Sequence, residues 1–201
     1  MARYTGPKRR LSRREGTALF AKDLAYLERK GAVPPGQHGT GRARRKVSEY
    51  GIQLREKQKA KRIYGLLERQ FAKYYQIASR KRGNTGQALL ELLETRLDNV
   101  VYRLGFTTSR ASARQMVSHG HIKIDGKKVN IPSFQVKPGI TVAILDKMLD
   151  NTQVKKSLEE SQTLPEWLQR KATVGKVLRV PTRDEMEPGI NEQMIVEYYS
   201  R

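Results

Sequence analysis

Apolar residues in the segment 48–82 recur with the period of an α-helix, and the remaining positions are rich in Lys and Arg. The apolar stripe is formed by Ile63, Leu66, Leu67, Phe71, Tyr74 and Tyr75. The pattern predicts one long, basic amphipathic helix. Such a helix could lie on anionic lipid, but a second apolar run follows at once, and this favours burial in a helical bundle.

The second helical run begins after a turn at residues 83–86 and continues to Leu104. Leucine and valine recur along it, and Gly105 is placed to cap its end in a left-handed conformation. Thr95 lies in the middle of this run. We expect a break there, where one domain passes into the next.

The segment 96–144 predicts two helices followed by short strands. Hydroxyl side chains precede a helix at about 109–119, and Gly120 ends it. Its exposed face would present Arg110 and Arg114, one turn apart. We expect this face to be cationic.

Strand signals follow directly. Ile122 and Ile124 alternate with polar residues, and Asp125-Gly126 is a strong signal for a tight hairpin turn. Further strands are predicted at 135–136 and 140–144. The segment therefore combines a helix–turn–helix-like pair with a small antiparallel sheet.

Residues 1–47 have the character of a basic arm. Proline and glycine in the segment 33–41 exclude a helix or a central strand there, and an amphipathic helix is plausible at 17–30. A disordered basic tail is the alternative. The interleaved apolar residues favour a segment that becomes ordered against a polyanion.

Composition adds the nature of the partner. The 201-residue chain has 40 Lys plus Arg against 20 Asp plus Glu, which gives a formal net charge of +20. Residues 1–90 carry a net charge of +17, and residues 91–201 carry +3. A charge of this size points to a polyanionic partner, most simply a nucleic acid.

Several other functions are excluded or unsupported. The chain has no cysteine, so disulfides, Cys-ligated zinc and thiol catalysis are excluded. We find no apolar run of membrane-spanning length and no signal-peptide pattern, and we expect neither a membrane association nor secretion. The three histidines and the acidic cluster Asp184, Glu185 and Glu187 lack the companions that a metal site or an acid–base pair needs. We therefore expect no enzyme, no cofactor, no metal and no small-molecule substrate.

A resemblance to a known family says more about fold and function than composition does. The segments 96–106 and 109–122 resemble the S-four RNA-binding module. The segments 2–8, 11–16, 35–39, 50–58 and 190–201 resemble the bacterial small-subunit ribosomal protein S-four family. The similarity extends over nearly the whole chain and is weakest at about 145–180.

The resemblance implies an α+β fold with three parts. These are an extended basic arm at 1–47, a helical domain at 48–94 completed by 180–201, and an inserted S-four module at 95–179. Many members of the family carry four cysteines in the arm that bind zinc. The matching stretch here, residues 8–14, has none, so the chain resembles the zinc-free form.

The resemblance also implies a function. The family binds 16S ribosomal RNA early in assembly, at a helix junction of the 5′ domain. Its neighbours are the S-five and S-three proteins and the path by which messenger RNA enters, and it affects decoding accuracy. Some members repress their own messenger. We therefore expect a cytoplasmic, ribosome-bound protein.

The candidate RNA-binding residues carry basic, aromatic or amide side chains. They are Arg3, Tyr4, Lys8, Arg9, Arg10, Arg13, Arg14, Gln37, His38, Arg42, Arg44, Arg45, Lys46, Tyr50, Gln53, Arg55, Lys57, Lys61, Arg62, Arg69, Lys73, Arg80, Lys81, Arg82, Arg110, Arg114, His119, Lys123, Lys127 and Lys128. Arg contacts phosphate through a fork of donors, whereas Lys acts as a point charge.

Three alternatives stay open from the residues alone. Arg110 and Arg114 could be an ordinary solvated helix face. An RNA-modifying or stress-related protein could use the same module as its RNA anchor. A nucleoid-type DNA binder would also be basic, although the second helix offers few base-reading side chains.

Overall fold

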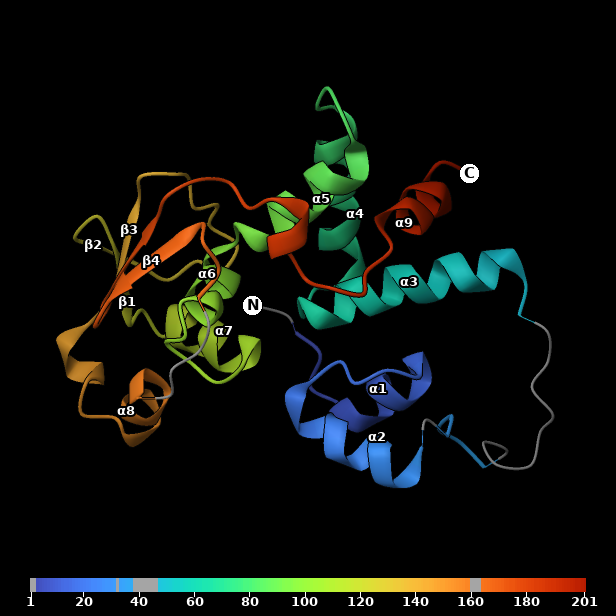
Figure 1. The fold of residues 1–201 in the computed structure, drawn as a ribbon, viewed down its shortest axis with the longest axis horizontal. Coiled ribbons are helices and arrows are strands. Elements are labelled where there is room, and N and C mark those ends of the chain that lie inside the picture. The colour runs from blue at the N-terminus through green and yellow to red at the C-terminus, as the bar shows by residue number, and fades with distance from the viewer. Residues whose placement is uncertain (1–2, 32, 38–46, 160–163) are drawn as a thin grey trace. The chain divides into compact units, whose positions relative to one another are not determined.

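The computed structural model describes residues 3–31, 33–37, 47–159 and 164–201 (Figure 1). The chain divides into two compact units, Met1–Ile77 with Gly189–Arg201, and Ala78–Pro188. The domain boundaries that we expect from the sequence, at residues 47, 94 and 179, remain predictions. The predicted contact residues His38, Arg42, Arg44, Arg45 and Lys46 lie outside the described residues.

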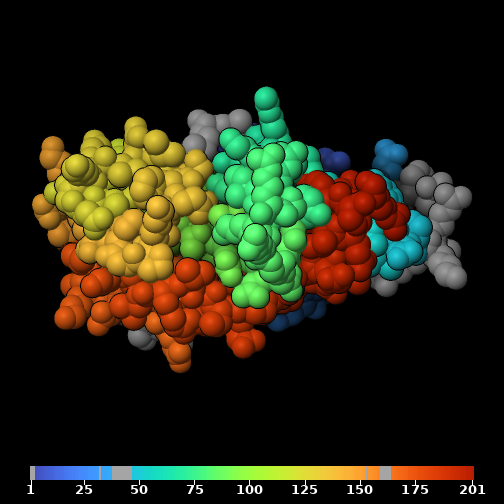
Figure 2. All heavy atoms as spheres, turned by 90° about the horizontal axis from the view of Figure 1, so that it is seen from above, coloured from blue at the N-terminus to red at the C-terminus, as the bar shows by residue number. Residues whose placement is uncertain are grey.

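The first unit is built from helices. Helix α3 contacts both α1 and the C-terminal helix α9, and Figures 1 and 2 show α9 beside α3. The segment that ends the chain thus completes the same unit as the segment that begins it. The elements are α1 (Lys8–Glu15), η1 (Ala21–Asp23), α2 (Leu24–Lys30), α3 (Glu49–Ile63), α4 (Glu68–Ser79) and α9 (Glu192–Tyr199).

The single helix predicted for residues 48–82 is wrong, because the structure ends α3 at Ile63 and begins α4 at Glu68. Gly65 takes a left-handed φ of 65°. The N–H of Gly65 donates to the carbonyl of Arg62 at 3.1 Å, and the N–H of Leu66 donates to the carbonyl of Lys61 at 2.9 Å. This is a glycine-based C-terminal cap, which satisfies the last carbonyls and turns the chain.

The described part of the N-terminal arm is less extended than expected. Helix α2 falls within the helix predicted at 17–30, but α1 covers the basic stretch 8–15 for which no helix was predicted. Gly16, with a φ of 72°, ends α1. The described part of the arm thus contains two short α-helices, of which only α2 was predicted.

The second unit combines helices with a sheet. Ser109 caps α7 by accepting a hydrogen bond from the N–H of Ser112, and Gly105 and Gly120 end α6 and α7 with φ values of 71° and 70°. Both expected helix ends and the break at Thr95 are confirmed. The helical elements are α5 (Thr85–Glu94), α6 (Leu97–Arg103), α7 (Arg110–Ser118), η2 (Asp146–Met148), α8 (Thr152–Glu159) and η3 (Arg183–Glu185).

The sheet has five antiparallel strands in the order β2-β1-β3-β5-β4. The predicted hairpin is confirmed, with positive φ at both Asp125 and Gly126, as a two-residue turn of this kind requires. The predicted strand at 135–136 is wrong, because Gln135 forms only an isolated bridge with Arg96. The strands are β1 (Ile122–Ile124), β2 (Lys127–Val129), β3 (Thr141–Ile144), β4 (Leu168–Lys171) and β5 (Val174–Val177).

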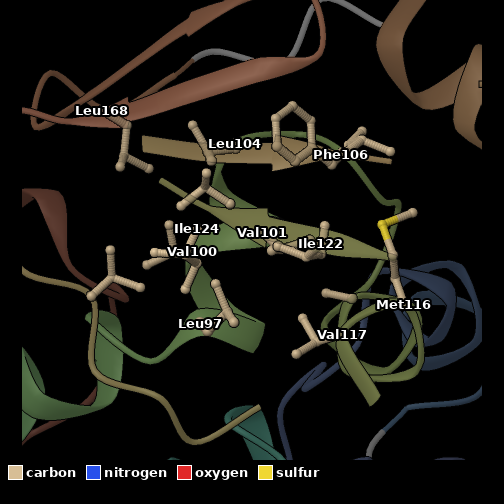
Figure 3. Packing of buried hydrophobic residues seen from close by; sticks show 14 of the residues in the cluster. Leu97, Val100, Val101, Leu104, Phe106, Met116, Val117, Ile122, Ile124 and Leu168 are labelled. Atoms are coloured by element: carbon tan, nitrogen blue, oxygen red, sulfur yellow. The ribbon is translucent and has the colours of Figure 1, made fainter. Parts of the chain in front are cut away.

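The core of the second unit joins the helix pair to the sheet. Figure 3 shows side chains from α6, α7 and β1 pointing toward one another. Leu97, Val101, Phe106, Val117 and Ile122 are fully buried in it. This core fixes α7 against β1, and so fixes where the basic side chains of both elements stand. The α+β fold class is confirmed.

Candidate nucleic-acid interface

Most basic side chains of α1 point outward because a buried polar contact fixes the helix. The Ser12 hydroxyl is buried and donates to Asp23 at 2.5 Å, and it accepts the N–H of Leu19 at 3.4 Å. Arg9 lies 3.9 Å from the same aspartate. Arg9 is nevertheless exposed, as are Arg3, Lys8, Arg10, Arg14 and the aromatic Tyr4.

Arg13 is used differently from its neighbours. It is half-buried, and its guanidinium donates to the backbone carbonyls of Val33 at 2.8 Å and Pro34 at 3.2 Å. It therefore ties the segment after α2 back to α1. Gln37, four residues beyond Val33, is exposed.

A buried carboxylate connects α1 to α3. The side chain of Glu15 is only 1% exposed, and it accepts from Arg55 at 3.3 Å and from Arg62. Burial raises the pKa of Glu15 in spite of the two guanidinium groups, and burial also lowers the pKa of Arg62. Arg55 and Arg62 thus hold the arm helix to the body, and both point toward protein.

A second acidic residue gathers cations from α3. Glu68 accepts from Lys57, from Lys61 and from the hydroxyl of Tyr199, at 2.8, 2.8 and 2.9 Å. Burial acts to raise the pKa of Glu68, but these hydrogen bonds outweigh it and lower the pKa to about 2. Lys57 is itself buried, and its ammonium lies 4.2 Å from the ring centre of Tyr198.

Two further predicted contacts of α3 lie at the C-terminal helix. Gln53 is buried and donates to Glu197 at 3.0 Å. Tyr50 is 48% exposed and lies near Tyr198, with ring centres 5.6 Å apart. Of this pair only Tyr50 is open to a partner.

Helix α4 and the residues after it carry basic side chains that face outward. Arg69 and Lys73 are exposed and four residues apart, so they lie on one face of α4. The next set belongs to the second unit. It comprises Arg80, Lys81 and Arg82, all exposed.

The expected exposed cationic face of α7 is wrong. Arg114 is only 8% exposed. Arg110 donates to Asn99 at 2.8 Å and to Glu187 at 2.5 Å, and its guanidinium lies 4.7 Å from the ring centre of Tyr102. Arg110 turns inward because an acidic and an aromatic partner within the unit receive it, and Arg114 is buried in the same helix.

Glu187 belongs to a larger buried network that the sequence did not reveal. Arg103 bridges Glu187 at 3.3 Å and Glu94 at 2.7 Å, and Glu94 is fully buried. Next to it, Arg96 is fully buried and donates to both carboxylate oxygens of Asp98, at 3.0 and 2.7 Å. The pair Arg103–Glu187 joins residues 84 positions apart, so no local sequence pattern could have found it, whereas Arg96 and Asp98 are only two residues apart.

The outward charges of the second unit lie on the hairpin. Lys127 and Lys128 are exposed, as is His119 at the end of α7, and Lys123 is half-buried. Lys123 and Lys128 stand directly opposite each other in the strand register. Two like charges in this position repel each other in the free protein, and a bound phosphate would relieve that repulsion.

Two further features bear on function. Within the part of the chain that the structure describes, no three His, Cys, Asp or Glu side chains gather as a metal site would need. The helices described there include none with the length and apolarity to cross a membrane.

Comparison with known proteins shows which family the chain resembles. Residues 3–94 match the family described as Ribosomal protein S4/S9 N-terminal domain, and residues 95–142 match the S4 domain. Small ribosomal subunit protein uS4 of Dictyoglomus turgidum is 57% identical over 208 residues, covering all of both chains. The chain belongs to the uS4 family.

Other uS4 relatives agree over the same span. Small ribosomal subunit protein uS4A of Symbiobacterium thermophilum is 53% identical and uS4 of Akkermansia muciniphila is 52% identical, each over the whole of both chains. The full coverage includes residues 145–180, where the sequence motifs were weakest. Within this family, what this chain can bind depends on which of its cations face outward and which are held inward by contacts within the protein.

Proposed function

We propose that this protein is a structural constituent of the small ribosomal subunit that binds 16S ribosomal RNA directly, without a catalytic role. The proposal is supported by the identity of 57% to a uS4 protein over the full length. The outward cations of α1, α4 and the hairpin supply the chemistry, because phosphate contacts dominate the affinity of proteins for RNA. The protein would then act in the cytoplasm, bound to the ribosome.

The finer parts of this proposal concern where on the subunit the protein binds and what that binding does. Binding at a helix junction of the 5′ domain would nucleate assembly of the subunit. Proteins S-five and S-three and the path of incoming messenger RNA would be neighbours, so the protein would affect decoding accuracy. Repression of its own messenger would use the same surface on a second RNA.

The structure narrows which predicted residues we assign to RNA. We propose contacts from the exposed positions Arg3, Tyr4, Lys8, Arg9, Arg10, Arg14, Gln37, Tyr50, Arg69, Lys73, Arg80, Lys81, Arg82, His119, Lys127 and Lys128, with the half-buried Lys123. The inward residues Arg13, Gln53, Arg55, Lys57, Lys61, Arg62, Arg110 and Arg114 are assigned to holding that surface in place. His38, Arg42, Arg44, Arg45 and Lys46 keep their predicted role on sequence alone.

Binding to a 5′-domain fragment of 16S RNA tests the proposal. The protein should bind this fragment more tightly than duplex DNA of equal length, since the fold offers shape and phosphate recognition and not a base-reading helix. It should also co-sediment with small subunits after a salt wash. Equal affinity for DNA and RNA, or loss from the subunits at moderate salt, would overturn it.

A further inference from the structure

A cavity of about 250 Å³ opens in the second unit at the C-terminal half of α7. The loop before α7, His121, the segment from Met148 to Asn151 and helix α8 supply the rest of its wall. None of the contacts described above uses it. Its opening lies next to His119, one of the exposed residues that we assign to RNA.

The wall of the cavity is apolar at its base. Phe106, Met116 and Val154 line it and are 0%, 6% and 3% exposed, so the floor belongs to the packed core. Phe106 and Met116 are labelled in Figure 3, where they stand at one end of that core. Such a floor favours a flat, apolar ring over a hydrated ion.

The rim of the cavity is polar and suited to hydrogen bonding. Gln115 and Asn151 contribute amides, each of which carries both donors and an acceptor. His119 and His121 contribute imidazole rings, whose centres are 6.0 Å apart. Amides that bond a base edge and rings that stack on its face are the groups by which proteins recognise unpaired bases in RNA.

A positive charge stands beside this rim. The side chain of Lys128 lies against Gly120, the residue between the two histidines, so closely that a Cβ at Gly120 would be 3.1 Å from its ammonium nitrogen. Lys123 is opposite Lys128 in the hairpin. Lys128 does not line the cavity itself, but it lies against the residue that joins two rim histidines, so floor, rim and ammonium together offer partners for a base, its edge and its phosphate.

We propose that this cavity receives one unstacked nucleobase of the bound RNA, with the phosphate of that nucleotide next to Lys128. The assignment rests on the proposed function, since it names how part of the same RNA is held. The lysines favour an anionic nucleotide over the apolar side chain of a neighbouring protein. The cavity would recognise a flipped-out base, whereas the outward cations recognise only phosphates.

Ultraviolet crosslinking of the full-length protein to a 16S 5′-domain fragment tests this directly. Trypsin cuts after Arg114 and Lys123, so residues 115–123 form one peptide that carries Gln115, Met116 and both histidines of the rim. We expect a nucleotide adduct on this peptide by mass spectrometry, at Gln115, Met116 or His121 and not only at His119 or Lys123, which belong to the outward surface. Adducts confined to other peptides would overturn the assignment.

A blocking variant adds an affinity measurement. Ser112→Phe places a ring into the cavity wall, and the matched control Ala111→Phe adds the same ring at the adjacent exposed position, which does not line the cavity. Ser112→Phe should weaken RNA binding by about tenfold, as expected for loss of one stacked base. It should also remove the adduct, whereas Ala111→Phe should change neither.

Ser112→Phe could fail to fold, and the fluorescence of Trp167 would reveal this. A second pair of variants tests the assignment in that case. Gln115 is exposed, and Gln115→Ala removes only its amide; Ser118→Ala is the control on the same helix. Gln115→Ala should weaken binding by about threefold, the worth of one hydrogen bond. Equal affinities of this pair would overturn the assignment.

The outcomes separate this inference from the proposed function. Wild-type protein that fails to bind the RNA overturns both. Wild-type protein that binds tightly, with no adduct on residues 115–123 and with normal binding by Ser112→Phe, overturns the cavity assignment alone. That second result includes the case in which a protein side chain fills the cavity.

Discussion

Helices α1 and α7 are both basic, yet they use their arginines in opposite ways. On α1, Arg10 and Arg14 are exposed. On α7, Arg114 is buried and Arg110 is held by Asn99 and Glu187. The difference lies in the partners, since α7 packs within reach of acids from distant parts of its unit. We therefore assign a basic residue to the RNA surface only where the fold leaves its side chain exposed, as it does for Arg9 even though Asp23 lies 3.9 Å away.

The largest effect should come from breaking an inward pair of the second unit. Arg96→Ala leaves the carboxylate of Asp98 buried without its partner. We expect a loss of about 3–5 kcal/mol in unfolding free energy, as for other buried pairs that lose one member. Urea unfolding followed by the fluorescence of Trp167 measures it, because this single tryptophan lies in the core of that unit.

Lys127→Ala is the matched outward control for Arg96→Ala. Lys127 is exposed on β2 of the same unit, so its loss should change the unfolding free energy by no more than about 0.5 kcal/mol. Equal losses for the two variants would remove the distinction between inward and outward cations.

The next largest effect concerns RNA affinity. The double variant Arg10→Ala with Arg14→Ala removes two outward charges of α1 and should weaken binding to the 5′-domain fragment by roughly tenfold at moderate salt. Its circular dichroism and unfolding midpoint should match those of the wild type. A filter-binding titration measures the affinity; an unchanged affinity would place the RNA away from α1.

A smaller, pH-dependent effect should come from Glu68. Its folded-state pKa is about 2, below the unfolded value, so its stabilising contribution is present above pH 5 and is lost as pH falls toward 2. Since Glu68 is 44% exposed, we expect a contribution of only about 1 kcal/mol.

The Glu68 contribution is isolated by comparing wild type and Glu68→Gln across this pH range. The wild type should lose about 1 kcal/mol more than Glu68→Gln between pH 5 and pH 2, as followed by helical circular dichroism. Parallel pH curves would show that Glu68 does not hold Lys57 and Lys61 in place.

The smallest effect should appear on the hairpin. Lys128→Glu replaces a repulsive cross-strand pair with an attractive one, opposite Lys123. The free protein should gain about 0.2–1 kcal/mol in stability while its RNA affinity falls. Thermal unfolding and RNA titration of the same sample measure the two changes; a gain in both would exclude the hairpin from the RNA surface.

Local signals predicted much of the fold. The caps at Ser109, Gly105 and Gly120 and the Asp125-Gly126 turn depend on a few adjacent residues, and each is confirmed. Gly65 carries the same capping signal as Gly105, and it separates α3 from α4. The apolar period continues across this glycine, so periodicity alone predicts one helix where the cap makes two.

The orientation of the charges could not be predicted, for a physical reason. Glu15 lies 47 residues from Arg62, and Glu187 lies 77 residues from Arg110. Only the packed fold brings such pairs together. Sequence patterns therefore identified which residues are cationic, and the structure was needed to show which of them face outward.

The most direct test of this account is the salt dependence of binding to the 16S 5′-domain fragment. Wild type, Arg10→Ala with Arg14→Ala, and the inward variant Lys61→Met should be compared in plots of log affinity against log salt. We predict a steep slope for wild type, a slope shallower by about 1.4 for the double variant, and the wild-type slope for Lys61→Met. A near-flat slope for wild type, or an equal reduction by the inward variant, would contradict the account.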